Sequence, residues 1–397
     1  MSDRLTEHMR YWRERTDTLQ DDQRYFYNQP IDALVSDARV LVRGREMLMF
    51  ASYGYLGLLG HPRINAAAKA AIDTYGTGTH GVRILAGTLR LHEELEETIA
   101  NFKDTEAAVT FSSGYATNLT AISSLLGRHD TVICDKLNHA SIVDGCLLSG
   151  AKFLRFKHND MLDLERVLHS ADSTGLKLVV VDAVFSMDGD VIDLPGVVEL
   201  CRRYHAYLMV DEAHAVGVLG QTGRGIEEHF GLSNVIDLKM GTLSKTIPSV
   251  GGYLAGRKDL IHIFKHASRA FVFSAALPPA QAAAAKVAFE VILAEPERIA
   301  TLNCNKQRWL SGLKRLGFDT LNTTTAIVPV VCGPDELAYD LVRECQQRDL
   351  FVLPVVSPAV PAGLARLRST VTAGHTAADI DQALEVLAAA GKAVGLI

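Results

Sequence analysis

The sequence predicts an α/β protein, with a large domain built on a mostly parallel sheet and a smaller α+β domain at the C-terminal end. From about residue 60 to 280, short β-branched runs alternate with helical stretches, and the runs are almost continuously apolar. Such strands are buried on both faces, as in a parallel sheet covered by helices on each side. After the Ala-rich segment 279–294 the order of strands and helices becomes mixed. We therefore expect an N-terminal helix and extended segment over residues 1–55, a large domain over 56–285 and a small domain over 286–397.

We predict the strands and helices from the positions where β-branched runs and helical patterns begin and end. Near the N-terminus, Val40–Val42 leads into Arg43-Gly44, which predicts a hairpin turn. In the large domain the predicted strands are 108–111, 131–134, 152–156, 178–182, 207–210 and 235–240, and the predicted helices are 114–126, 140–149, 161–169 and 194–204. In the small domain the predicted strands are 326–331 and 350–354, and the predicted helices are 336–348 and 377–390.

Composition and charge exclude several classes of protein. The chain of 397 residues is 48% hydrophobic and 22% charged with a net charge of −6, as in an ordinary globular protein, and its basic residues form no stripe for nucleic acid. No apolar run reaches the length of a membrane span, and Met1–Arg15 lacks the apolar core of a secretory signal. The cysteines show no metal-ligand spacing and are expected to be free thiols in a reducing cytoplasm: Cys134, Cys146, Cys201, Cys304, Cys332 and Cys345. No metal site is expected.

Polar side chains follow the predicted strands at the point where each strand ends. Lys245 lies in Thr242-Leu243-Ser244-Lys245 and Asp211 in Asp211-Glu212-Ala213-His214, each directly after a buried run. In parallel sheets, ligands bind at the carboxyl ends of the strands. A lysine that can form a Schiff base and an aspartate that can keep a pyridine nitrogen protonated are the two groups that a pyridoxal phosphate (PLP) enzyme needs. Lys245 alone would more often be a surface lysine, but the other strand-end residues favour a PLP site.

The remaining strand-end residues fit the same cofactor. Ser113, Gly114 and Tyr115 open a helix after a strand, where free N–H groups and the helix dipole suit a phosphate, although a lone Ser-Ser-Gly is also an ordinary helix cap. Thr242 and Ser244 can add hydroxyl donors.

Three further side chains at strand ends could contact the cofactor ring or its surroundings. His139 could stack on the ring, and His214 could contact the ring oxygen, although a lone histidine is more often a core residue. Ser186 is a further polar group at a strand end, or simply the turn residue before Asp188-Gly189.

The stretch 76–83 is Gly-rich but is not a dinucleotide-binding fingerprint, because its spacing lacks GxGxxG and no strand leads into it. It is typical of a close-packed loop near a ligand or a partner subunit. We expect Arg83 at its end to contact the substrate.

These motifs together resemble the α-oxoamine synthases, a family of fold-type I PLP transferases. The resemblance covers nearly the whole chain and is carried by Asn138-His139-Ala140-Ser141, by Phe185–Asp190, by Asp211–His214 and by Gly241–Lys245. Within the family the chain looks most like the bacterial serine palmitoyltransferase branch, through Pro358–Gly363 and Gly374-His375-Thr376 among its C-terminal stretches.

The resemblance implies a PLP-dependent acyltransferase of lipid or secondary-metabolite biosynthesis. It would condense an amino acid with an acyl thioester on coenzyme A or a carrier protein, lose CO2 and yield an α-amino ketone. It also implies that Lys245 holds the cofactor and later acts as acid and base, that Arg368 binds the amino-acid carboxylate, and that Tyr53, a tyrosine shared with the sphingolipid branch, contacts the substrate. Ser274 would reach the phosphate of the neighbouring subunit in an obligate homodimer with a shared site.

Two departures from the family pattern leave the amino acid open. The family usually carries Asn where this chain has Gly54, and the serine branch has an arginine where this chain has Val356-Ser357. Alanine or glycine are therefore alternatives to serine, as in 8-amino-7-oxononanoate synthase-like or 2-amino-3-ketobutyrate CoA ligase-like enzymes. An aminotransferase on the same fold and a catalytically silent partner subunit are the remaining alternatives.

Overall fold

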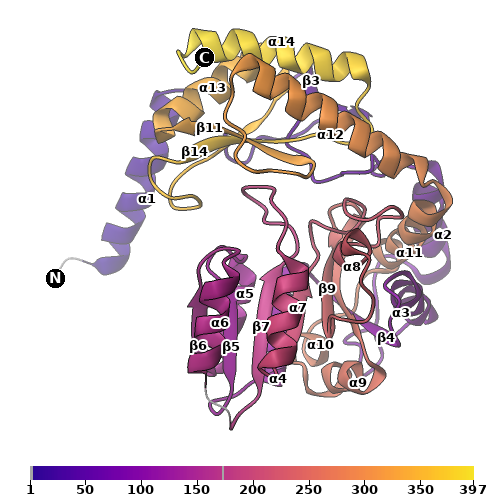
Figure 1. The fold of residues 1–397 in the computed structure, drawn as a ribbon. Coiled ribbons are helices and arrows are strands. Elements are labelled where there is room, and N and C mark those ends of the chain that lie inside the picture. The colour runs from indigo at the N-terminus through magenta and orange to yellow at the C-terminus, as the bar shows by residue number, and fades with distance from the viewer. Residues whose placement is uncertain (1–2, 172–173) are drawn as a thin grey trace.

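The computed structural model describes residues 3–171 and 174–397, and its centre is a seven-stranded sheet (Figure 1). The strands in their spatial order are β4 (Ala107–Phe111), β10 (Pro248–Gly256), β9 (Leu238–Ser244), β8 (Tyr207–Asp211), β7 (Lys177–Asp182), β5 (Thr131–Asp135) and β6 (Lys152–Phe156). Neighbours from β9 to β6 pair in parallel, whereas β10 is antiparallel to both of its neighbours. The predicted mostly parallel sheet is therefore confirmed.

Helices cover both faces of this sheet, as the apolar strands require. In β5, β7 and β8, alternate side chains enter two different apolar clusters: Ile133, Val179 and Leu208 belong to one, and Val132, Val180 and Met209 to the other. The helices of the large domain are α2 (Pro62–Tyr75), α3 (Arg90–Phe102), α4 (Gly114–Leu125), α5 (Ala140–Ser149), α6 (Met161–Ser170), α7 (Leu194–Arg203), α8 (Ile226–Phe230), α9 (Lys258–Ala267), α10 (Arg269–Val272) and α11 (Pro279–Ala294).

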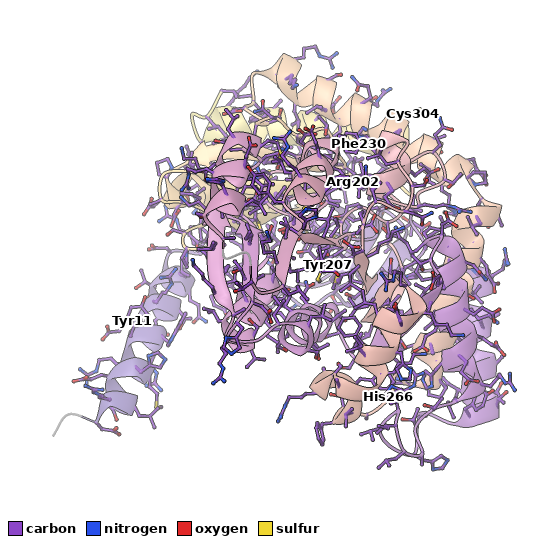
Figure 2. All side chains as sticks on the ribbon, turned by 60° about the horizontal axis from the view of Figure 1, so that its bottom comes forward. Tyr11, Arg202, Tyr207, Phe230, His266 and Cys304 are labelled. Carbon is purple, nitrogen blue, oxygen red and sulfur yellow. The ribbon has the colours of Figure 1, made fainter. Side chains whose placement is uncertain are left out.

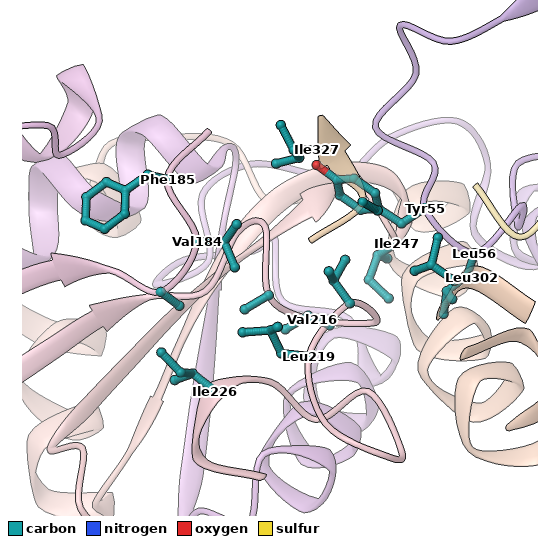
Figure 3. Close-up of a cluster of buried hydrophobic side chains, with 14 of the residues drawn as sticks. Tyr55, Leu56, Val184, Phe185, Val216, Leu219, Ile226, Ile247, Leu302 and Ile327 are labelled. Carbon is teal, nitrogen blue, oxygen red and sulfur yellow. The ribbon is translucent and has the colours of Figure 1, made fainter. Parts of the chain in front are cut away.

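The C-terminal part forms a second layer, drawn above the large sheet in Figure 1. Its three-stranded antiparallel sheet contains β11 (Ile327–Gly333), β14 (Ala365–Thr370) and β13 (Leu353–Val355). Its helices are α12 (Glu297–Leu316), α13 (Asp335–Gln347) and α14 (Ala377–Ala393). Figure 3 shows how the two parts share apolar packing, because Val184, Val216 and Leu219 of the large domain lie in one cluster with Leu302 and Ile327.

The N-terminal segment pairs with the C-terminal part. The strands β1 (Ala33–Ser36), β2 (Arg39–Val42) and β3 (Arg45–Met49) form a sheet that β12 (Leu350–Phe351) completes in parallel with β3. The predicted hairpin turn is present, with Arg43 and Gly44 both at positive φ. The helix α1 (Arg4–Asp21) stands away from the body of the protein and buries none of its residues, as the position of Tyr11 in Figure 2 shows.

Most element boundaries agree with the sequence within a few residues, but three features differ. The strand predicted at 235–240 is β9, at Leu238–Ser244, and the strand predicted at 350–354 is split into β12 and β13. The strands β10 and β14 and the helices α2, α3, α8, α9, α10 and α12 were not predicted. Gly251 and Gly252 lie in β10. A Cβ at Gly252 would stand 2.4 Å from Thr117 Oγ1, so this glycine allows close packing against α4.

No helix within residues 3–171 and 174–397 is both long and apolar enough to cross a bilayer. The cysteines are free thiols in the structure, and five of the six are buried; Cys304 is the exposed one.

Candidate active site

The ends of β4, β5, β7, β8 and β9 meet around a cavity of about 280 Å³, which we call the strand-end cavity. The side chains that line it include most of those predicted from the sequence: Ser113, Gly114, Tyr115, His139, Ser186, Asp211, His214, Thr242, Ser244 and Lys245. Because these residues come from separate loops, their convergence results from the parallel sheet, which brings strand ends to one edge.

Lys245 follows β9 directly, and its amine contacts a buried histidine. Lys245 Nζ lies 2.8 Å from His214 Nε2, and His214 Nδ1 lies 2.7 Å from the Tyr55 hydroxyl. Burial, partly opposed by Asp211 and assisted by Arg368, lowers the pKa of Lys245 to about 8. Burial, with Lys245 beside it, lowers the pKa of His214 well below its usual range. A neutral His214 therefore accepts from the protonated lysine and donates through Nδ1 to Tyr55.

Asp211 ends β8 with a buried carboxylate that has two donors. Asn118 Nδ2 donates to Oδ2 at 2.7 Å, and the backbone N–H of Ala213 donates to Oδ1 at 2.8 Å. The neighbouring strand ends in Asp182, and its burial together with the charge of Asp211 raises the pKa of Asp182 well above its usual range. Two buried carboxylates at the ends of adjacent strands repel each other when both are charged, so this pairing favours the protonated form of Asp182.

An anion-binding cradle lies at the first turn of α4. Ser113 caps this helix by accepting from the backbone N–H of Ala116, and the next residue, Gly114, faces β9. A Cβ at Gly114 would stand 3.0 Å from Thr242 Oγ1, which itself lies 2.9 Å from Ser244 Oγ. The helix N-terminus and two hydroxyls thus offer several donors to one anion without a side chain between them.

Two predicted substrate contacts, Arg368 and Tyr53, do not line the strand-end cavity but lie close to residues that do. Arg368 on β14 is buried; its Nε donates to the carbonyl of Ser186 at 2.7 Å, and its Nη2 has no hydrogen-bond partner among the described residues. The Tyr53 ring lies 4.7 Å from Arg368 Cζ and 5.8 Å from Lys245 Nζ. A buried guanidinium with a free N–H beside a reactive amine is suited to hold a carboxylate.

The loops that carry His139 and Ser186 are joined by a histidine. His158 Nδ1 lies 3.0 Å from Asp135 Oδ1, and its Nε2 lies 2.9 Å from Asp190 Oδ2. Burial by itself would lower the pKa of His158, but the hydrogen bonds to the two aspartates outweigh it and raise the pKa to about 10. His158 is therefore an imidazolium at neutral pH and ties the two loops together.

Two further predicted residues, Arg83 and Ser274, also lie outside the strand-end cavity. Arg83 is buried in an ion pair with Glu96 at 2.8 Å and also donates to Thr110, so its side chain is engaged within the large domain. Ser274 precedes Ala275, which bridges to Val82 in the Gly-rich stretch, and so lies beside that loop. Contacts of these residues with a substrate or with a neighbouring subunit stay predictions.

Sequence reasoning missed three side chains that support the site: Asn118, Asp182 and Tyr55. Asn118 stands four residues after Gly114, on the same face of α4, so helical spacing could have identified it. The backbone N–H of His139 donates to Asp182 Oδ2 at 2.8 Å, a contact made only once β5 and β7 are adjacent. Tyr55 reaches His214 across a sequence separation of 159 residues, and no local signal reports such a pair.

The chain is similar to known proteins along nearly its whole length. Residues 45–387 match the family described as aminotransferase class I and II. The 8-amino-7-oxononanoate synthase of Geobacter sulfurreducens is 45% identical over 363 residues, which is 91% of this chain and 93% of that protein. The protein of the same name from Bacillus pumilus is 40% identical over 387 residues, 98% of each chain.

Solved structures show the same architecture. Sphingomonas wittichii serine palmitoyltransferase has a TM-score of 0.96 with 34% identity, over 100% of both chains. A high-resolution structure of SPT with its PLP internal aldimine has a TM-score of 0.96 with 35% identity, again over 100% of both chains. An 8-amino-7-oxononanoate synthase from Francisella tularensis has a TM-score of 0.75 with 26% identity, over 87% of this chain and 98% of that one.

Proposed function

We propose that this chain, which belongs to the aminotransferase class I and II family and to its α-oxoamine synthase branch, is a PLP-dependent acyltransferase. It would condense an amino acid with an acyl thioester, with loss of CO2, to give an α-amino ketone. The observation that carries the proposal is the pairing of Lys245 and Asp211 in one cavity, with the amine pKa lowered to about 8.

The residues of the strand-end cavity fit the phosphate, the ring nitrogen and the ring face of PLP. Whether His214 contacts the ring oxygen stays a prediction, because its two nitrogens lie beside Lys245 Nζ and the Tyr55 hydroxyl. The α4 N-terminus, Thr242 and Ser244 would hold the phosphate, and the glycine at position 114 leaves the space that a side chain would fill. Asp211 would pair with the protonated ring nitrogen, and His139 would lie against the ring. When bound, PLP supplies an aldehyde that takes up an amine and a ring that withdraws electrons from the amino-acid Cα.

The chain's own side chains would orient the amino acid and move its proton. Arg368 would hold the carboxylate through its free Nη2, which fixes the direction of the bond to be broken. Lys245 would remove the Cα proton, because an amine with a pKa of about 8 is a competent base near neutral pH. His214 would accept a hydrogen bond from the Lys245 amine and keep it directed into the cavity.

The relatives favour alanine over serine as the amino acid, so the serine palmitoyltransferase-like interpretation becomes the second choice. In 8-amino-7-oxononanoate the amino-bearing carbon 8 carries only the methyl carbon 9, which is the skeleton that alanine leaves when it loses CO2. The absence of an arginine at Val356-Ser357 agrees with this choice. A homodimer remains part of the proposal, because the Gly-rich stretch 76–83 and Ser274 do not line the chain's own strand-end cavity and could contribute to that of a second copy.

Purified chain, reconstituted with PLP and given alanine, glycine or serine with an acyl-CoA, tests the proposal. We expect a visible cofactor band and the release of one thiol and one CO2 per turnover, fastest with alanine. A keto acid product without thiol release would instead indicate an aminotransferase. A chain that shows no cofactor band on its own would indicate a silent subunit.

A further inference from the structure

A second and larger concavity is lined by Tyr53 and by residues that precede it in the sequence. It has a volume of about 690 Å³ and lies between the segment from Phe26 to Val40, the loop after β3 and the strands β12 and β13. We call it the N-terminal groove. Its apolar walls include Phe26, Ile31, Leu34, Val35, Met49 and Phe351. Its volume falls in the range of small-molecule sites, which are mostly apolar concavities of roughly 300–1,000 Å³.

Tyr53 places one wall of the N-terminal groove near the groups proposed to react. Tyr53 lines the groove, and the same ring lies 5.8 Å from Lys245 Nζ and 4.7 Å from Arg368 Cζ. A thioester that reacts with the amino-acid Cα beside Lys245 would extend its acyl chain past Tyr53 into the groove, because the cofactor would fill the strand-end cavity.

The groove offers no cation to such a ligand. Among the described residues, Asp37 is the single ionisable acid or base that lines it, apart from the Tyr53 phenol. Burial raises the pKa of Asp37, with Arg298 and His61 opposing this effect from nearby. Both of those side chains are already held by Glu295: Arg298 Nε lies 2.7 Å from Oε2, and His61 Nε2 lies 3.1 Å from Oε1. A carboxylate at the end of a ligand would therefore meet an acid and no free base.

We propose that the N-terminal groove holds the acyl chain of the thioester substrate and selects an uncharged chain over one that ends in a carboxylate. This inference rests on the proposed function and adds the class of acyl donor to it. The expected acyl donor therefore differs from that of the relatives named 8-amino-7-oxononanoate synthase. Their product is a nonanoate, so its acyl-derived portion ends in a carboxylate. Half-exposed apolar side chains such as Leu34 (51%) and Val35 (50%) would be covered by the bound chain.

Matched pairs of thioesters test the selection. With alanine as the amino acid, kcat/KM from thiol release is compared for heptanoyl-CoA against heptanedioyl-CoA, and for palmitoyl-CoA against hexadecanedioyl-CoA. We expect the uncharged member of the better pair to be favoured by about 10-fold or more, because an unpaired charge in an apolar site is costly. Equal use of both members, or preference for the diacid, would overturn the inference and leave the proposed function intact. Thiol release from none of them, with any amino acid, would overturn both.

A substitution in the groove tests whether the groove determines the acyl preference. Leu34→Arg places a cation on the half-exposed wall, where it need not disturb the core, and should reduce the preference for the uncharged chain by about 10-fold. Leu162→Arg is the matched control, since Leu162 is 81% exposed on α6 and lies outside the groove, and it should leave the preference unchanged. If Leu34→Arg changes the oligomeric state in light scattering but not the acyl preference, the groove is covered by a second copy of the chain and the inference is wrong.

Discussion

Tyr53 lines the N-terminal groove, and its ring lies 5.8 Å from Lys245 Nζ of the strand-end cavity, but the two concavities are built in different ways. The cavity collects polar side chains from the ends of parallel strands, and each of its main groups has a buried partner, such as Asn118 for Asp211 and Tyr55 for His214. The groove collects apolar side chains from the N-terminal segment and from β12 and β13, several of them half-exposed and without polar partners.

The difference indicates that the strand-end cavity carries out the reaction, whereas the N-terminal groove selects the acyl donor. Charged groups held by hydrogen bonds in a buried site stabilise the charges that develop during the reaction. Small displacements of these groups therefore reduce the rate. An apolar wall can change in shape and length at little cost to the core. Substitutions in the cavity should therefore reduce turnover with every acyl donor, whereas substitutions in the groove should change which donor is used.

Lys245→Ala should have the largest effect. It removes the amine that would hold PLP and move the Cα proton, so we expect kcat to fall by roughly 10³-fold or more with every thioester, together with loss of the visible cofactor band. Absorption spectra and thiol release measure both. Lys258→Ala, at an exposed position on α9, is the control and should behave like the parent. A Lys245→Ala protein with the band and near-normal turnover would contradict the assignment.

Asp211→Asn should have the next largest effect, again independent of the acyl donor. The amide keeps the size of the side chain but cannot hold the ring nitrogen in its protonated form, so we expect kcat to fall by about 10²–10³-fold with cofactor still bound. Titration with PLP and steady-state kinetics separate binding from turnover. Unchanged turnover would show that the carboxylate at the end of β8 is structural only.

The capture of PLP by the cofactor-free protein should depend on pH through Lys245. Its pKa is lowered to about 8, so below that value the amine is mostly protonated, and the capture rate should fall about tenfold per pH unit. Above it the rate should level off. Stopped-flow absorbance gives the profile. Since Asp211 raises the pKa of Lys245, Asp211→Asn should move the profile to lower pH, and an unmoved profile would contradict the coupling.

The contrast between the strand-end cavity and the N-terminal groove also explains which parts of the protein could be predicted from the sequence. The strand-end rule identified Lys245, Asp211 and the helix start at Ser113, because each position depends only on where a strand stops. It could not identify the N-terminal groove, because β12 joins β3 across about 300 residues. Nor did it identify β10, since Pro248, Gly251 and Gly252 are typical of a loop until β4 and β9 are placed on either side.

Tyr55→Phe should have a moderate effect. It removes the hydroxyl 2.7 Å from His214 Nδ1 and leaves that nitrogen buried without its partner. A hydrogen bond of this kind contributes about 1 kcal/mol, so we expect kcat to fall by about fivefold with all acyl donors. Tyr253→Phe is a matched control, because Tyr253 is equally buried and its hydroxyl has no hydrogen-bond partner in the described part of the chain. Equal losses in the two variants would show that His214 does not depend on Tyr55.

Leu34→Ala should have the smallest effect, and one confined to selection. Leu34 is 51% exposed in β1, so its truncation should change the free energy of unfolding by less than about 0.5 kcal/mol. The wall of the groove loses apolar surface, at about 0.8 kcal/mol for each methylene of substrate left uncovered, so KM for a long acyl-CoA should rise about threefold to fivefold. KM for acetyl-CoA and kcat for both donors should stay unchanged, because Tyr53 and the strand-end cavity are untouched. A loss of kcat equal for short and long donors would contradict the separation of the two regions, since it would mean that β1 supports the chemistry and not the choice of substrate.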